Sequence, residues 1–240
     1  MSAQHSPVSP LTDDTQGFDP GARELYEGLL ERWPERPFRP YGKDMLHAVV
    51  ATILSQRTTY RNQRLAHDRL WDTFGSWEAI AQAPVEEIQR CIASSTYPEN
   101  KAPVIRSFLQ KLHELRGSFD LEFLADWDVH EAYNWITQFK GLGPKTASFS
   151  LLFHLGKPIL PVDTHVGRVS ERYGLIPKKA SNKRAHDLLN AMMPQGDTHI
   201  IYNYHRVLFD HGRRICTFRR PNCAACPVQK TCAYGQSTGA

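Results

Sequence analysis

Four of the five cysteines lie close together near the end of the sequence. Cys216, Cys223, Cys226 and Cys232 are separated by six, two and five residues. A structural zinc site usually takes its thiolates from two closely spaced pairs, and only one such pair is present. Four unevenly spaced thiolates are also typical of a 4Fe–4S cluster, so spacing favours iron and sulfur but leaves zinc open. Cys91 stands apart, and we expect it to be a small core residue.

A second chemical motif is the run Gly141-Leu142-Gly143-Pro144-Lys145 between two helical stretches. Glycines permit a tight reversal, proline suits the first turn of a helix, and Leu142 is expected to pack back into the core. Backbone N–H groups at such a turn can bind phosphate, although an ordinary helix–helix turn has the same composition. Lys145 stands at the positive end of a helix dipole, which disfavours an ammonium and favours a nucleophilic amine.

A third motif is Val162-Asp163-Thr164-His165, which opens another helical stretch. Aspartate is a common helix N-cap, and that role alone would explain Asp163. Its second oxygen could still exchange protons with Lys145 or with a reacting sugar. The sequence therefore predicts that Asp163 caps a helix, which is compatible with a second role as a catalytic carboxylate.

Basic residues lie within the cysteine segment. Arg219 and Arg220 fall between the first two cysteines. A loop pinned by a metal centre would present these side chains rigidly to backbone phosphates, whereas the alternative is an ordinary solvated charged loop. We expect phosphate contact.

The elements that must position these residues are predicted to be helices. Leu46, Val49, Val50, Ile53 and Leu54 form one apolar helical stripe. Further stripes run over residues 66–74, 105–115 and 121–139. Glycines 75, 117 and 174 stand where helices should end, and prolines 84 and 103 stand where helices should begin. The fold is predicted to be all-α, with an extended connector over residues 157–162.

Composition restricts the class of protein. Of 240 residues, 41% are hydrophobic and 22% are charged, which excludes disordered and fibrous chains. The net charge is +4, and residues 1–20 contribute only acidic charge, so the remainder has a larger basic excess. No apolar run is long enough to span a membrane and no export signal is visible, so we expect a soluble, cytoplasmic protein.

Taken together, the hairpin motif, the Val162–His165 motif and the cysteine spacing resemble the endonuclease III family of DNA glycosylases, over about residues 21–234. The resemblance implies two helical domains with DNA bound in the cleft between them. A six-helix barrel with the helix–hairpin–helix would cover residues 41–156, and a discontinuous cluster domain would cover 21–40 and 157–234. Residues 1–20 and 235–240 would be flexible tails.

The resemblance also implies the chemistry. Lys145 would attack C1′ of a damaged nucleotide, Asp163 would assist the proton transfers, and β-elimination would cut the strand. The four cysteines would hold a 4Fe–4S cluster. The partner would be double-stranded DNA containing abasic sites or damaged bases, the oxidised pyrimidines in particular. The enzyme would be a monomer associated with the nucleoid.

The resemblance also implies the remaining DNA contacts. The backbone of Gly141, Leu142 and Gly143 would hold phosphate, and His165, in the same motif as Asp163, would also contact DNA. Gln56 or Arg57 would fill the gap left by the flipped base, and Tyr97 would be a second wedge. Tyr60 stands where the family commonly has an acidic residue, which changes the chemistry near the flipped base.

Two other functions fit part of the pattern. A monofunctional adenine glycosylase would lack the hairpin lysine and carry a further C-terminal domain. A non-catalytic DNA-binding or redox-sensing protein would need neither Lys145 nor Asp163. The presence of both residues favours a DNA glycosylase with abasic-site lyase activity.

Overall fold

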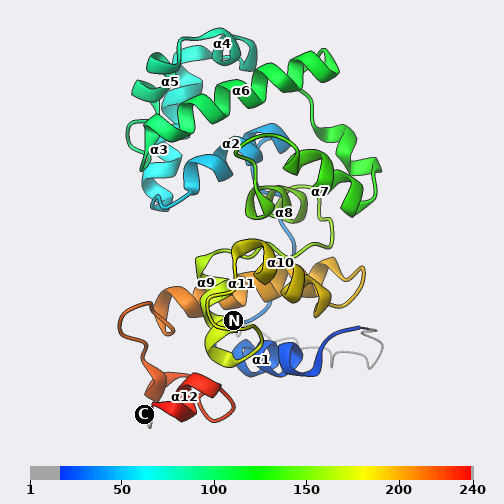
Figure 1. The fold of residues 1–240 in the computed structure, drawn as a ribbon, viewed down its shortest axis with the longest axis vertical. Coiled ribbons are helices and arrows are strands. Elements are labelled where there is room, and N and C mark those ends of the chain that lie inside the picture. The colour runs from blue at the N-terminus through cyan, green and yellow to red at the C-terminus, as the bar shows by residue number, and fades with distance from the viewer. Residues whose placement is uncertain (1–16, 239–240) are drawn as a thin grey trace, which may run out of the picture.

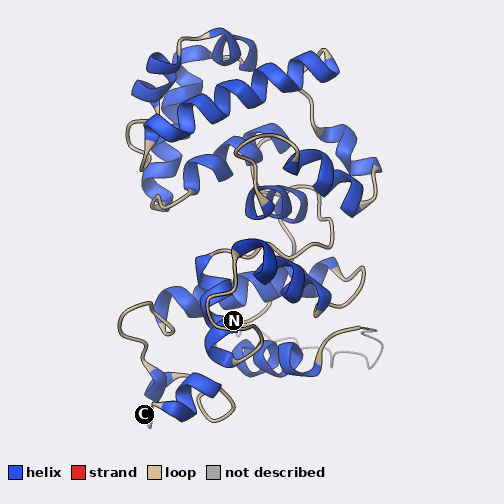
Figure 2. Ribbon diagram, in the orientation of Figure 1, coloured by secondary structure: helices blue, strands red, loops and turns tan. Residues whose placement is uncertain are grey.

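The computed structural model describes residues 17–238, and these residues form only helices and loops (Figure 2). The predicted all-α fold is confirmed. Most of the predicted N-terminal tail, and the last two residues, lie outside the described residues. The α-helices are α1 (Pro20–Leu30), α2 (Met45–Ser55), α3 (Tyr60–Phe74), α4 (Trp77–Gln82), α5 (Val85–Cys91), α6 (Pro98–Arg116), α7 (Val129–Thr137), α8 (Pro144–Phe153), α9 (Thr164–Tyr173), α10 (Asn182–Ala191), α11 (Thr198–Arg214) and α12 (Ala233–Ser237). Two short 3-10 helices cover Glu122–Asp126 and Cys223–Ala225.

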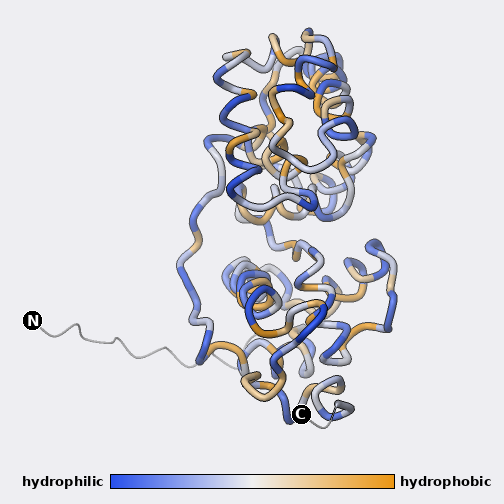
Figure 3. Tube along the Cα trace, turned by 90° about the vertical axis from the view of Figure 1, so that its left-hand side faces the viewer, coloured by the Kyte–Doolittle hydropathy of each residue, from blue (hydrophilic) through white to orange (hydrophobic). Residues whose placement is uncertain are grey.

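The helices gather into two lobes, each with its own hydrophobic core (Figure 1). Helices α2 to α8 form the first lobe, and the apolar stripe predicted in α2 is fully inside its core. Hydrophobic and hydrophilic residues alternate along the helices of both lobes, as amphipathic helices around a core require (Figure 3). The first lobe therefore forms because each of its helices has one apolar face to bury.

The second lobe combines the beginning and the end of the described chain. Helix α1 packs against α11, although about 170 residues separate them (Figure 1). Buried tyrosines join the two helices, with the rings of Tyr26 and Tyr204 5.8 Å apart. Helices α9 and α10 and Val228 complete this core.

Helix α8 fastens the two lobes together. Ala147 and Leu151 lie in the first core, and Leu152 and Phe153 lie in the second. Because α8 is small or apolar on most sides, it can be buried between two cores at once. The hairpin at the start of α8 is thereby held at the junction of the lobes.

Three predicted boundaries differ from the structure. Helix α6 begins at Pro98, so Pro103 lies inside the helix and not in its first turn. The stripe over 121–139 is interrupted, because Asp128 accepts hydrogen bonds from His130 and Glu131 and starts α7 there. The ends are more ordered than expected: Phe18 is buried, Asp19 caps α1, and α12 extends to Ser237.

Other predicted features agree with the structure. Glycines 75, 117 and 174 end their helices in the left-handed conformation. Residues 157–162 form no helix. Within residues 17–238, every helix is too short or too polar to cross a bilayer.

Candidate active site and DNA interface

The hairpin between α7 and α8 is shaped by its two glycines. Gly141 has a φ of +92°, and a Cβ there would lie 2.7 Å from Val104 Cγ1, so both the backbone and the space require glycine. Leu142 is only 2% exposed, which agrees with its predicted place in the core. No side chain caps the start of α8, and the N–H groups of Thr146 and Ala147 donate to the Gly143 carbonyl at 3.0 and 3.1 Å. Because Pro144 has no N–H, the backbone amides that an anion can approach here are those of Gly143 and Lys145.

Lys145 lies in the first turn of α8 with its amine half-buried. Its Nζ donates to Ser55 Oγ at 3.1 Å and stands 5.0 Å from the centre of the Phe149 ring. Burial lowers the pKa of Lys145 below the ordinary lysine value, and the Asp163 carboxylate partly opposes this shift. The net effect increases the fraction of uncharged, nucleophilic amine near neutral pH.

Asp163 is the N-cap of α9. Its Oδ1 accepts from the backbone N–H groups of His165 and Val166, both at 2.8 Å, and its Oδ2 takes no part in these two bonds. The carboxylate is close enough to affect the pKa values of both Lys145 and the buried His205. One oxygen therefore fixes the side chain while the other is free to exchange a proton.

The residues predicted to enter DNA lie together on the first lobe. Gln56, Arg57 and Tyr97 line one pocket of about 440 Å³, and Gly141 of the hairpin lines it as well. All three side chains are exposed. Tyr60 is also exposed, in the first turn of α3, with the Arg64 guanidinium 6.0 Å from the centre of its ring.

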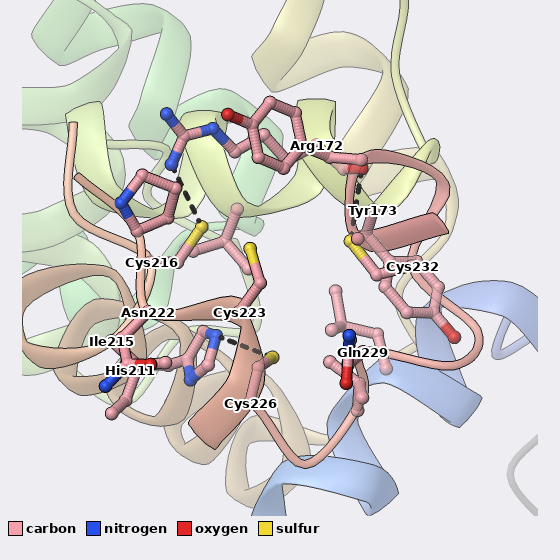
Figure 4. Close-up of a pocket in the computed structure, with 16 residues that line it drawn as sticks. Arg172, Tyr173, His211, Ile215, Cys216, Asn222, Cys223, Cys226, Gln229 and Cys232 are labelled. Atoms are coloured by element: carbon pink, nitrogen blue, oxygen red, sulfur yellow. Dashed lines mark hydrogen bonds between the residues drawn. The ribbon is translucent and has the colours of Figure 1, made fainter. Parts of the chain in front are cut away.

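The four clustered cysteines surround one largely apolar cavity in the second lobe. Figure 4 shows their sulfur atoms directed into this space from a loop, a 3-10 helix and the approach to α12. All four are free thiols. Among residues 17–238, no three His, Cys, Asp or Glu side chains converge closely enough to hold a single metal ion. Four soft thiolate donors around a shared cavity nevertheless suit a centre in which each iron binds one cysteine.

Two arginines of α9 hold the loop that carries the predicted phosphate contacts. Arg172 donates to the carbonyls of Thr217 and Phe218 at 2.7 and 2.8 Å, and Arg168 donates to the carbonyl of Cys216 at 2.9 Å. Arg219 and Arg220 remain exposed at the tip of this loop. Because α9 begins at Asp163, one helix connects the predicted catalytic carboxylate with the cysteine loop.

Several residues of the site were not indicated by the sequence. Ser55 and Phe149 contact the Lys145 amine, and the buried His205 packs against the rings of Phe149 and Phe153 of α8, with its Nδ1 2.9 Å from the carbonyl of Pro161. His165, which the sequence did indicate, packs edge-on against Phe209, with ring centres 5.0 Å apart. Serine, phenylalanine and histidine at these positions match no motif, since only the packing of distant helices brings them to the amine.

The geometry is that of a helix–hairpin–helix protein with a lysine and an aspartate at the junction of two helical lobes. The chain belongs to the HhH-GPD superfamily of base excision DNA repair proteins, whose family model matches residues 50–210. This match covers well over half of the chain.

Individual relatives agree with this assignment. The chain is 28% identical over 216 residues to endonuclease III of Thermotoga maritima, covering 90% of this chain and 94% of that protein. It is 32% identical over 172 residues to the DNA glycosylase/AP lyase ROS1 of Arabidopsis thaliana, covering 66% of this chain. It spans only 12% of ROS1, and 61% of another Arabidopsis thaliana relative that is 32% identical over 182 residues.

Solved structures show the same fold. A trapped covalent intermediate of endonuclease III with DNA superposes with a TM-score of 0.77 at 22% identity, covering 91% of this chain and 97% of that one. A thermostable thymine-DNA glycosylase superposes with a TM-score of 0.72 at 21% identity, covering 90% and 97%.

Proposed function

We propose that this protein is a DNA glycosylase with abasic-site lyase activity that uses Lys145 as its nucleophile. The observation that carries the proposal is the Lys145 amine, half-buried at the start of α8, with its pKa lowered by burial and the Asp163 carboxylate nearby. An amine in this state can form a Schiff base with a sugar.

The reaction follows from the two side chains. The Lys145 nitrogen attacks C1′ and the glycosidic C1′–N bond breaks, so the base departs with the bonding pair and takes up a proton from solvent. Asp163 accepts the proton that the amine releases. The C1′–O4′ bond then breaks as O4′ takes up the proton held by Asp163, which gives a protonated imine. The C2′ proton passes to solvent, and the electron pair left behind expels the C3′ oxygen with the 3′ phosphate, which cuts the strand on the 3′ side. We propose oxidised pyrimidines as the excised bases.

The proposed DNA interface spans both lobes. The hairpin backbone at Gly141, Leu142 and Gly143 would bind phosphate on one side of the reacting nucleotide, and Arg219 and Arg220 would bind phosphate on the other. Gln56 or Arg57, together with Tyr97, would enter the duplex and keep the target nucleotide extruded, with His165 beside the catalytic carboxylate. We propose that the two lobes are two domains and that the protein acts as a monomer.

The proposed cofactor is a 4Fe–4S cluster held by Cys216, Cys223, Cys226 and Cys232. The four thiols around one cavity support this ligand set. When bound, the cluster would supply a rigid anchor for the loop that carries Arg219 and Arg220, because it ties both ends of that loop. Metal analysis of purified protein tests the proposal: about four iron atoms per chain are expected, and stoichiometric zinc without iron would overturn it.

Strand cleavage tests the activity. Lys145→Gln keeps the side-chain length, so folding and DNA binding should persist while cleavage of an abasic duplex falls by about 1,000-fold or more. Lys140→Gln is the matched control, since Lys140 is an exposed lysine of the same hairpin, and it should cleave at nearly the wild-type rate. Equal rates for the two variants would contradict the proposal. Duplexes that each carry one modified base would then identify the excised bases.

A further inference from the structure

Lys101, in the first half of α6, is a buried lysine with no role in the chemistry described above. Its side chain is 5% exposed. Its Nζ donates to the carbonyls of Leu54 and Gln56 at 2.8 and 2.7 Å, and to the hydroxyls of Ser95 and Thr58 at 2.7 and 3.0 Å. Three N–H groups thus serve four neutral oxygens. Burying an ammonium is costly without such partners, so the arrangement calls for an explanation.

The partners of Lys101 belong to two separate loops. Leu54, Gln56 and Thr58 lie at the end of α2 and just after it, and Ser95 lies in the loop before α6. A hydroxyl group of each loop also forms a hydrogen bond with the backbone of the other loop. Ser95 Oγ donates to the Leu54 carbonyl at 3.2 Å, and Thr58 Oγ1 accepts from the Thr96 N–H at 3.0 Å. Lys101 is therefore the centre of a polar network that joins residues 54–58 to residues 95–96.

The two loops hold their exposed tips in an unfavourable backbone conformation. Arg57 has a φ of +54° and Tyr97 has a φ of +55°, which non-glycine residues rarely adopt. Each residue directly adjoins a group in the network: Arg57 lies between Gln56 and Thr58, and Tyr97 follows Thr96. Strained positions persist only when the surrounding structure fixes them. Lys101 supplies that fixation for both tips at once.

The same network reaches the reacting amine. Ser55, which accepts the hydrogen bond from Lys145, stands between the two residues whose carbonyls bind Lys101. Lys101 and Lys145 are close enough for the Lys145 charge to act with burial in lowering the pKa of Lys101 to about 8. Lys101 itself bonds to the loop and not to Lys145, so its direct effect is on the position of the residues that would enter DNA.

We infer that Lys101 is a positioning residue that locks the loops of residues 55–59 and 95–97 into the one arrangement that can extrude a nucleotide from the duplex. The inference rests on the proposed function, because it takes Gln56 or Arg57, and Tyr97, as the residues that enter DNA. Lys101 does not touch the reacting sugar. Its removal should therefore impair extrusion far more than the chemical step.

The experiment compares Lys101→Met with Lys111→Met in the full-length protein. Methionine keeps the length of the side chain and removes its charge and donors, and Lys111 is an exposed lysine on the same helix. Two DNA substrates are used: a fully paired duplex with a central abasic site, and the same strand with that site inside an unpaired bubble. Extrusion costs little in the bubble because the stacking is already broken.

Single-turnover cleavage of the two substrates separates an effect of Lys101 on extrusion from an effect on the chemical step. Lys101→Met should cleave the paired duplex about 10- to 100-fold more slowly than wild type, and the bubble less than about 3-fold more slowly. Lys111→Met should match wild type on both. Fluorescence of 2-aminopurine placed opposite the abasic site should rise on binding of wild type but not of Lys101→Met. Equal losses on both substrates, or none on either, would overturn the inference.

Two further sets of variants complete the test. If Lys101→Met does not fold, Thr58→Val decides, since it removes one hydroxyl of the network and should give the same paired-to-bubble difference in weaker form. Lys101→Arg keeps the charge and should restore part of the extrusion. Arg57→Ala and Tyr97→Ala test the proposed function itself. If these variants and Gln56→Ala all extrude normally, the proposed DNA-entering residues and the inference both fail, while the role of Lys145 is decided separately by strand cleavage. If they fail to extrude while Lys101→Met succeeds, only the inference about Lys101 is wrong.

Discussion

At the scale of single residues, burial and the Asp163 carboxylate have opposite effects on the pKa of Lys145. Burial favours the neutral amine, and the carboxylate favours the ammonium. Burial prevails, so the amine needs less alkaline conditions than an exposed lysine to become nucleophilic. Asp163 limits this advantage but provides a group to receive the proton.

Asp163→Asn separates these two effects. Asparagine is also a good N-cap, so α9 should keep its start and the protein should remain folded. Without the carboxylate, the pKa of Lys145 should fall further, and the acid limb of the pH–rate profile should shift to lower pH. The maximal rate should fall by about 100-fold or more, because an amide cannot accept the proton. A single-turnover pH profile measures both quantities, and an acid limb that moves to higher pH would contradict the assigned coupling.

Residues of the candidate active site could be predicted from the sequence only where they belong to a recognisable motif. Lys145 and Asp163 were predicted because each stands at a recognisable helix start. Lys101, Ser55 and Arg172 were not, because burial of a lysine or the reach of an arginine across to another loop depends on tertiary packing. No spacing in the sequence distinguishes Lys101 from the solvated Lys111.

At the scale of elements, the hairpin shows how two glycines of one motif have different tasks. Gly141 combines a left-handed backbone with direct contact to Val104, whereas Gly143 has a φ of −87° and open space around its Cβ position. Only the first is a requirement of folding. The second leaves room for a partner to approach the first turn of α8.

Alanine substitutions should reveal this division. Gly141→Ala should lower the free energy of unfolding by about 1–3 kcal/mol, through backbone strain and the clash with Val104. Gly143→Ala should change stability by less than about 0.5 kcal/mol but weaken binding to DNA, because its methyl group would occupy the proposed phosphate position. Urea unfolding and binding to an abasic-site analogue give the two values. Equal destabilisation by both variants would show that the hairpin is not built as described.

Helix boundaries were predictable where a local signal exists and not where packing decides. Helices α3, α6 and α9 each end at a glycine in the left-handed conformation, and a glycine at that place is a signal that the local sequence alone provides. The start of α6 at Pro98 was missed, because the left-handed Tyr97 before it has no sequence signature. Likewise, the small and apolar residues of α8 allow burial, but which residues enter which core is decided by the meeting of the two lobes.

At the scale of the whole molecule, DNA affinity should depend on groups spread over both lobes. Arg219 and Arg220 lie at the exposed tip of a loop held by Arg172 of α9, in the second lobe. The hairpin and the pocket with Gln56, Arg57 and Tyr97 lie in the first. A duplex that bridges the two would meet the Lys145 amine at their junction.

Replacing Arg219 and Arg220 with alanine should weaken binding to damaged and undamaged duplexes alike, because phosphate contacts carry no sequence information. The slope of log affinity against log salt should become shallower by about two units, since two fewer counterions are released. Binding titrations at several salt concentrations measure this slope. An unchanged slope would remove the loop from the DNA interface.

The central claim is that Lys145 becomes covalently attached to the sugar. Incubation of the wild-type protein with an abasic duplex and sodium borohydride should reduce the imine to a stable crosslink, and mass spectrometry of the digested complex should place the sugar on the peptide that contains Lys145. Lys145→Gln should give no crosslink, and Lys140→Gln should give the wild-type amount. A crosslink mapped to another amine, or trapping of Lys145→Gln at the wild-type rate, would contradict the account.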